Sequence, residues 1–218
     1  VEWKPFLIGA AFKATGNSPP AMAVPAKGKY MMTDLKLSAG YLGIPITMPA
    51  SFPINSLLPM RFSLAAMHGD KGAELAKAVM HAHWGEGKDV SQPEVLSEIA
   101  GSLGLDGEAL LAATQDQSIK DELKANCESA ISRGAFGAPT FFVGDTMFWG
   151  HDRLPILEAF LDGRLFLTEA DERMVIGADS AGGYRITDAL TGEDLGEVGK
   201  RDVSKVRINN KLRQLVKG

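Results

Sequence analysis

Two short motifs near residue 140 have the residue types needed to bind a small peptide-like ligand. The first is Gly137-Ala138-Pro139-Thr140, in which a proline begins an apolar run typical of a strand. A cis bond before Pro139 would turn the chain sharply and present the N–H and C=O of Ala138 to a ligand that adds as a strand. The alternative is a plain trans proline, because the first position of a strand needs no N–H for the ladder.

The second motif is Gly150-His151-Asp152-Arg153, at the point where the next apolar run ends and a helical pattern begins. Asp152 is placed to cap that helix, and the free N–H groups of a helix start favour a carboxylate. The Asp152 carboxylate could instead bind the ammonium group of a ligand. The alternative is a helix cap with no ligand.

Other polar residues carry weaker signals. Asn17 offers an amide in a loop dense in Gly and Pro, but such a loop is also an ordinary turn. Lys27 could contact an anion, although a single loop lysine is usually only solvated. His81 and His83 are two positions apart, so a helix directs them to different faces and we predict no metal site. Cys127 lies in an amphipathic helical pattern and is predicted to be buried filler rather than a reactive thiol.

The composition limits the class of protein. Hydrophobic residues make up 45% and charged residues 23%, as in an ordinary globular protein. The net charge of −4 argues against a nucleic-acid partner. One cysteine allows no internal disulfide and favours a reducing compartment, so we expect a cytoplasmic protein. No apolar run approaches the ~18 residues of a membrane span, so we expect no membrane contact for residues 1–162.

The motifs need a scaffold of helices with a few strands. Aromatic and branched residues predict a strand over residues 2–9, followed by a loop over 13–28. Asp106 and Ser91 are the predicted N-caps of two helices. A Gly144-Asp145 turn is predicted to join two strands into a hairpin, and a final helix is predicted over 153–161. Helical periodicity recurs at 29–43, 60–69, 71–85, 92–104, 106–114 and 117–134.

The pattern changes after residue 162. Residues 1–162 carry 13 basic and 18 acidic residues, whereas residues 163–218 carry 10 and 9. The later part predicts short strands at 173–177 and 184–187, a Gly-Gly bend, a Thr-Gly turn and a basic helical tail. We therefore predict two domains, residues 1–162 and a small α+β module over 163–218. A hairpin needs further strands, so we also expect at least one strand before Val1.

Several segments together resemble one known family. They are GNSPP, KGKYMMTDLKL, YLGIPITMPASFPIN, HAHWGEG and GAFGAPTFFVGDTMFWGHDRL. They resemble the 2-hydroxychromene-2-carboxylate isomerases and kappa-class glutathione transferases over residues 1–162, and FGAPTFFV with FWGHDRL leans to the isomerase branch. The resemblance implies an α/β thioredoxin-like fold, related to the DsbA disulfide oxidoreductases, with a helical insertion at about 30–115. It also implies a possible homodimer.

The resemblance further implies glutathione as the cofactor. Pro139 would be the family's cis proline, and the Ala138 backbone would pair with the cysteinyl part of glutathione. His151 and Asp152 would hold its γ-glutamyl end. Asn17 and Lys27 would line the same cleft.

The resemblance places Arg61 and Trp84 on the side of the second substrate, a small aromatic compound from an aromatic-degradation route. The glutathione thiolate would add reversibly to that substrate, the adduct would rotate about a former double bond, and elimination would regenerate glutathione. The family's catalytic serine lies in a segment like S-P-x-S after the first strand. No serine of this chain has that place, so we expect the first strand and helix to lie before Val1. We therefore expect a truncated form with little or no turnover.

Other readings of the sequence stay open. A thiol-disulfide oxidoreductase or a glutathione transferase would share the same fold. Residues 163–218 resemble the soluble N-terminal region of urea-type ABC transporter permease subunits, most distinctively in ITDALTG and LGEVGKRDVSKVRINNKLR. That resemblance predicts a non-catalytic transporter module, or a joined fragment with its junction near residues 160–165.

Overall fold

The computed structural model of the protein describes residues 1–18, 24–50, 52–163, 165–167, 174–178, 184–188 and 194–198. The chain divides into two units, Val1–Met147 and Phe148–Gly218, and each is described by itself. The domain boundary predicted at residues 162 and 163 stays a prediction.

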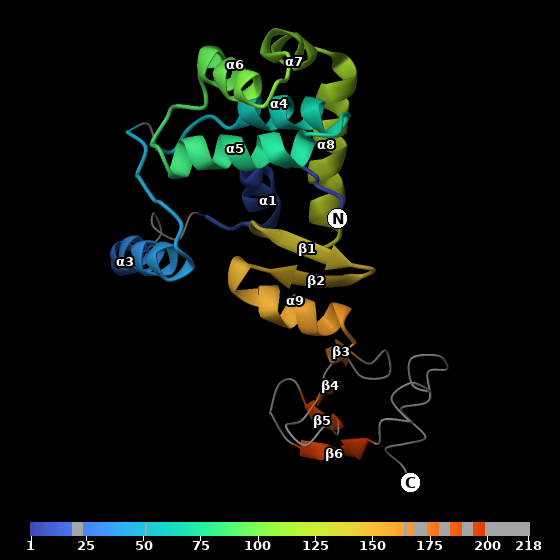
Figure 1. Ribbon diagram of the computed structural model, residues 1–218. Coiled ribbons are helices and arrows are strands. Elements are labelled where there is room, and N and C mark those ends of the chain that lie inside the picture. The colour runs from blue at the N-terminus through green and yellow to red at the C-terminus, as the bar shows by residue number, and fades with distance from the viewer. Residues whose placement is uncertain are drawn as a thin grey trace. The chain divides into compact units, whose positions relative to one another are not determined.

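The first unit is built almost entirely from helices (Figure 1). They are α1 (Ile8–Thr15), α3 (Pro25–Leu42), α4 (Leu57–Met67), α5 (Gly72–Trp84), α6 (Pro93–Ser102), α7 (Gly107–Ala113) and α8 (Gln117–Ser132). Figure 1 shows α4 and α5 side by side, and α4 also contacts α8. All six helices predicted from periodicity between residues 29 and 134 are confirmed.

The strand predicted over residues 2–9 is wrong. Residues 1–7 form no regular element, and α1 begins at Ile8. Aromatic and branched side chains favoured a strand, but a strand also needs a neighbouring ladder, which a short stretch of sequence cannot reveal. Ala10 and Ala11 favour the helix instead, and Ala11 is fully buried in it.

The loop predicted over residues 13–28 is shorter than expected. α1 continues to Thr15, and α3 already begins at Pro25, because proline is well suited to the first turn of a helix. Residues 19–23 of that loop lie outside the described residues. The predicted end of α3 is confirmed, since Gly43 has a left-handed φ of 66° and its N–H bonds to the carbonyls of Ala39 and Gly40.

The main core of the first unit lies between α4, α5 and α6. Phe62, Leu75 and Leu96 are fully buried in it. Burying each such side chain contributes roughly 1.5–3 kcal/mol. Gly72 lets α5 approach α4 closely, because a Cβ at Gly72 would lie 2.5 Å from the Cα of Met67.

The N-terminal segment is held against α8. The backbone N–H of Leu7 donates to Sγ of Cys127 at 3.2 Å, and the side-chain amide of Asn126 donates to the carbonyl of Pro5 at 3.3 Å. Cys127 is only 6% exposed, which confirms that it is buried. These two bonds join residues that are 120 and 121 positions apart in the sequence.

One of the two predicted helix caps is confirmed. The carboxylate of Asp106 accepts a hydrogen bond from the backbone N–H of Ala109 at 3.0 Å and so caps α7. The prediction for Ser91 is wrong, because α6 begins at Pro93 and its N-cap residue is Gln92. The Ser91 hydroxyl instead donates to Asp89 at 2.6 Å.

The predicted hairpin is confirmed. β1 (Thr140–Val143) and β2 (Thr146–Trp149) pair through the turn at residues 144–145, where Gly144 has a φ of 56°. In the second unit, a short 3₁₀ turn, η1 (His151–Arg153), leads into α9 (Leu154–Leu161). The rings of Phe148 and Phe160 meet edge to face at 5.3 Å and pack α9 on the end of β2.

The second unit also holds a four-stranded antiparallel sheet in chain order. Its strands are β3 (Leu165–Leu167), β4 (Met174–Ala178), β5 (Tyr184–Asp188) and β6 (Asp194–Val198). β4 and β5 correspond to the two strands predicted there. The predicted Gly-Gly bend, Thr-Gly turn and basic tail lie outside the described residues. Among the helices that the structure describes, none is long and apolar enough to cross a membrane.

Candidate functional site

The peptide bond between Ala138 and Pro139 is cis, as the resemblance implied. Both residues are exposed, and they follow Gly137, which is buried. The hydroxyl of Thr140 donates to the carbonyl of Gly137 at 2.7 Å and closes a tight turn around the proline. Ala138 and Pro139 therefore lie at the surface immediately before β1 begins.

The hairpin that follows Pro139 is fixed to the end of α8 by Arg133. The guanidinium carbon of Arg133 lies 3.8 Å from the centre of the Phe142 ring, and the same guanidinium donates to the carbonyl of Gly144. Cation–π contacts of this kind contribute about 0.5–1 kcal/mol at exposed sites. The sequence reasoning missed Arg133, because its contact with Phe142 depends on how the end of α8 packs against β1.

His151 and Asp152 belong to the second unit, where both are exposed in η1. The prediction that Asp152 caps the following helix is wrong, because neither η1 nor α9 has a side-chain cap. The Asp152 carboxylate instead forms an ion pair with Arg153 at 2.9 Å. The Asp152 carboxylate therefore pairs with the neighbouring Arg153 and not with the backbone N–H groups at the start of the helix.

Asn17 and Lys27 lie near the two ends of the loop between α1 and α3. Asn17 follows Gly16, the left-handed residue that ends α1, and its side-chain oxygen accepts the N–H of Ser18 at 2.9 Å. Lys27 is exposed in the first turn of α3. Among the described residues, no hydrogen bond or ion pair joins Asn17, Lys27 and Ala138, so their grouping in one cleft stays a prediction.

Arg61 and Trp84 were predicted on the side of the second substrate. Nε of Arg61, on α4, is buried and has no hydrogen-bond partner among the described residues. Trp84 is the last residue of α5, and its ring lies 5.5 Å from that of Phe52 and 4.9 Å from that of His83. The sequence reasoning missed Phe52, because nothing in the pattern brings residues 32 positions apart together.

Comparisons with known proteins decide the family. The family described as "DSBA-like thioredoxin domain" matches residues 1–162, about three quarters of the chain. The chain belongs to this family. The thioredoxin-like fold predicted for these residues is thereby confirmed, here as a mostly helical domain with a small antiparallel hairpin.

Several relatives of this DsbA-like domain are enzymes by name. The 2-hydroxychromene-2-carboxylate isomerase of Sphingobium xenophagum is 35% identical over 165 residues, which cover 74% of this chain and 82% of that protein. Glutathione S-transferase kappa 1 of Homo sapiens is 32% identical over 175 residues, or 74% of this chain and 77% of that protein. A solved structure of 2-hydroxychromene-2-carboxylate isomerase superposes with a TM-score of 0.61 at 29% identity, covering 73% of this chain and 78% of that one.

These relatives confirm two predictions at the level of the family: the chain has isomerases and kappa-class glutathione transferases as homologues, and its family is one of enzymes. They do not extend to the transporter resemblance of residues 163–218, which stays a prediction. The roles of the individual site residues also stay predictions.

The DsbA-like domain carries a cluster of charges just after α5. Nζ of Lys88 lies 2.8 Å from Glu86, and Nε2 of His81 lies 3.4 Å from the same carboxylate. The hydrogen bond and charge of Lys88 lower the pKa of Glu86, and Glu86 in turn raises the pKa of Lys88. These groups are exposed, so the pairs add little stability. Within the described part of the chain, no group of three or more His, Cys, Asp or Glu side chains is arranged to hold a metal.

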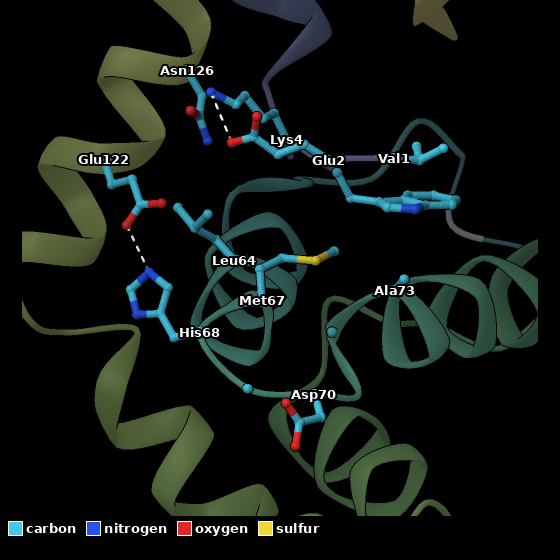
Figure 2. Close-up of a pocket in the computed structure, with 13 residues that line it drawn as sticks. Val1, Glu2, Lys4, Leu64, Met67, His68, Asp70, Ala73, Glu122 and Asn126 are labelled. Atoms are coloured by element: carbon cyan, nitrogen blue, oxygen red, sulfur yellow. Dashed lines mark hydrogen bonds and ion pairs between the residues drawn. The ribbon is translucent and has the colours of Figure 1, made fainter.

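A groove of about 370 Å³ lies between the N-terminal segment, α4 and α8 (Figure 2). Two pairs of its polar side chains contact each other, since Nε2 of His68 lies 2.8 Å from Glu122 and Nζ of Lys4 lies 3.1 Å from Glu2, and Asp70 also lines it. These two pairs leave His68, Glu122, Lys4 and Glu2 less available to a ligand than unpaired side chains would be.

Proposed function

We propose that this DsbA-like protein is a glutathione-dependent isomerase resembling 2-hydroxychromene-2-carboxylate isomerase. The observation that carries the proposal is the exposed Ala138, joined by a cis bond to Pro139 just before β1, in a domain that is 35% identical to such an isomerase. An extended thiol peptide can pair with an exposed strand end through main-chain hydrogen bonds. We further propose a homodimer and a cytoplasmic location, the latter on the single cysteine.

The proposed site holds glutathione by both of its ends. The N–H and C=O of Ala138 pair with the cysteinyl part, next to Pro139. His151 and Asp152 hold the γ-glutamyl end, where the carboxylate of Asp152 attracts the α-ammonium group. Asn17 and Lys27 complete the cleft, with the Lys27 ammonium available to a carboxylate of the tripeptide.

The proposed reaction is a reversible addition of the glutathione thiolate. The sulfur forms a bond to one carbon of a double bond conjugated with a carbonyl, and the displaced electron pair moves to the carbonyl oxygen. The former double bond is now single and rotates. The electron pair then returns, the C–S bond breaks, and the thiolate leaves unchanged. Arg61 and Trp84 are proposed to face the second substrate, where a guanidinium suits a carboxylate and an indole suits an aromatic ring.

Calorimetric titration of the 218-residue protein with reduced glutathione tests the proposal without requiring turnover. We expect saturable binding that Asp152→Asn and Lys27→Met each weaken about tenfold, the loss typical of one charge-assisted hydrogen bond. Asp145→Asn, in the turn between β1 and β2, is the control and should bind normally. The proposal fails if glutathione does not bind, or if all three variants bind as the unchanged protein does.

A glutathione transferase is the second candidate, because relatives named glutathione S-transferase kappa match the same three quarters of the chain. The two candidates differ in what happens to the adduct. An isomerase returns free glutathione with a rearranged substrate, whereas a transferase releases a stable thioether. Mass spectrometry of the products of an active form separates them.

A further inference from the structure

We propose that Phe52 and Trp84 together form the surface that binds the aromatic ring of the second substrate. The proposal rests on the proposed function for the identity of that ligand. It adds Phe52 as a specificity-determining residue, and it treats the two rings as one binding element.

The two rings form a pair that remains open to solvent on one side. Their centres lie 5.5 Å apart and their planes are inclined by 59°, a geometry typical of favourable aromatic contacts. Phe52 is nevertheless 56% exposed, and Trp84 is only half-buried. Both rings therefore keep solvent-exposed surface on which a third planar ring can pack.

Contacts of His83 and Thr47 hold Trp84 in place. His83 is 5% exposed and meets the Trp84 ring nearly edge to face at 4.9 Å, while its Nδ1 lies 3.0 Å from the carbonyl oxygen of Lys88. The backbone N–H of Thr47 donates to the carbonyl of Trp84 at 2.6 Å and joins Thr47 to the end of α5. Rings that are already fixed lose little conformational entropy when a ligand binds.

Two exposed methionines, Met80 and Met48, lie on the segments that carry the pair. Met80 lies one helical turn before Trp84 on α5 and is 50% exposed. Met48, in the same loop as Phe52, is also exposed. Thioether side chains adapt their shape and make favourable contacts with aromatic rings.

The relatives give the class of ligand that fits this surface. The first of them is named for 2-hydroxychromene-2-carboxylate, a bicyclic aromatic acid. A bicyclic ring offers two faces and an edge to the inclined pair, and its carboxylate can remain in water or meet a cationic side chain. The occupant that we propose is therefore a small bicyclic aromatic carboxylate, with 2-naphthoate as the probe.

Fluorine NMR of the 218-residue protein labelled with 5-fluorotryptophan tests the proposal. The chain has three tryptophans, Trp3, Trp84 and Trp149, so each resonance can be assigned by a single Trp→Phe substitution. We expect titration with 2-naphthoate to shift the Trp84 resonance and to leave that of Trp3 unchanged. Cyclohexanecarboxylate, which has the charge without the aromatic ring, should shift Trp84 much less. No shift at Trp84, or an equal shift with both acids, overturns the proposal.

Variants of Phe52 test the pair itself. We expect Phe52→Leu to weaken 2-naphthoate binding about threefold to tenfold, the range of one aromatic contact, and Phe52→Tyr to keep it. Tyr41→Leu removes another exposed aromatic side chain, on α3, and is the control that should bind normally. Equal binding by Phe52→Leu and the unchanged protein overturns the proposal, and so does a loss in Phe52→Tyr equal to that in Phe52→Leu.

Glutathione binding, measured in the same samples, separates this inference from the proposed function. A shift at Trp84 that depends on the Phe52 ring, in a protein that does not bind glutathione, keeps the inference and removes the proposed function. Normal glutathione binding without a 2-naphthoate effect at Trp84 keeps the proposed function and removes the inference.

Discussion

The carboxylate of Asp152 occupies the space that a side chain on Gly150 would need. A Cβ at Gly150 would lie 2.5 Å from Oδ1 of Asp152, while Oδ2 of the same carboxylate lies 2.9 Å from Nη1 of Arg153. Gly150 has a φ of 98° and a ψ of 151°, a region that is essentially restricted to glycine. The orientation of Asp152 therefore depends on the absence of a side chain two residues earlier.

Gly150→Ala tests this dependence. We expect a loss of about 1–3 kcal/mol in the free energy of unfolding, the cost of a non-glycine residue in this region. Under the proposed function, glutathione binding should weaken as well, because the displaced carboxylate is the proposed partner of the ammonium group. Urea denaturation and calorimetry measure the two effects. A variant with unchanged stability and unchanged affinity would contradict the description of this turn.

Substitution of two further glycines by alanine should change the stability of the protein in opposite directions. A Cβ at Gly107 would lie 2.7 Å from the Cα of Ser97, so Gly107→Ala must separate α7 from α6 and should cost about 1–3 kcal/mol. Gly101, on α6, has nothing within 4 Å of such a Cβ. Gly101→Ala should therefore stabilise the protein by about 0.5–1 kcal/mol through its better helix propensity. Thermal unfolding of the two variants should show a lower Tm for Gly107→Ala and a higher Tm for Gly101→Ala. Equal changes in Tm would refute the packing described for α6 and α7.

Asp106, which caps α7, should contribute more to the free energy of unfolding than Asp116, which precedes α8. Asp106→Ala removes the hydrogen bond to the N–H of Ala109 and should cost about 0.5–2 kcal/mol. Asp116 stands at the N-cap of α8 but makes no side-chain cap bond, so Asp116→Ala is the matched control with a smaller expected loss. Asp106→Asn keeps an acceptor and should retain most of the stability. Chemical denaturation curves of the three variants rank them, and a larger loss in Asp116→Ala would argue against this assignment.

Asp89 gives a prediction for acid pH. The hydroxyl of Ser91, the side chain of Gln92 and the backbone N–H of Ser91 lower the pKa of Asp89 in the folded protein. A carboxylate with a lowered pKa contributes stability above its ordinary pKa, and that contribution is lost as the pH falls through the folded value. Ser91→Ala should therefore raise the pKa of Asp89 towards its ordinary value. Carbon-13 NMR of the side-chain carboxyl measures it, and an unchanged titration would mean that the hydroxyl bond is absent.

The helices were predictable from the sequence because their signals are local. Gly43 ended α3 as expected, and the turn at residues 144–145 formed the hairpin. The first strand failed because strand pairing depends on a partner that the residues themselves do not specify. The caps predicted at Ser91 and Asp152 were wrong for a different reason. Ser91 bonds to the nearby Asp89, and Asp152 pairs with the adjacent Arg153, in place of the helix N–H groups.

The candidate site was predictable only through its motifs. The segment around Pro139 could be read as a ligand-binding turn, because a proline before an apolar run limits what the backbone can do there. The approach of Phe52 to Trp84 and of Arg133 to Phe142 could not, since each depends on how separate elements pack. Side chains that meet through tertiary contact leave no spacing rule in the sequence.

The bonds from Leu7 to Cys127 and from Asn126 to Pro5 also have a consequence for synthesis on the ribosome. Pro5 and Leu7 leave the exit tunnel before their partners on α8, which are translated some 120 residues later. At about 5–20 residues per second, that interval is on the order of 6–24 seconds. During that time α1 has no α8 to pack on, so its apolar side stays available to chaperones until α8 has been translated.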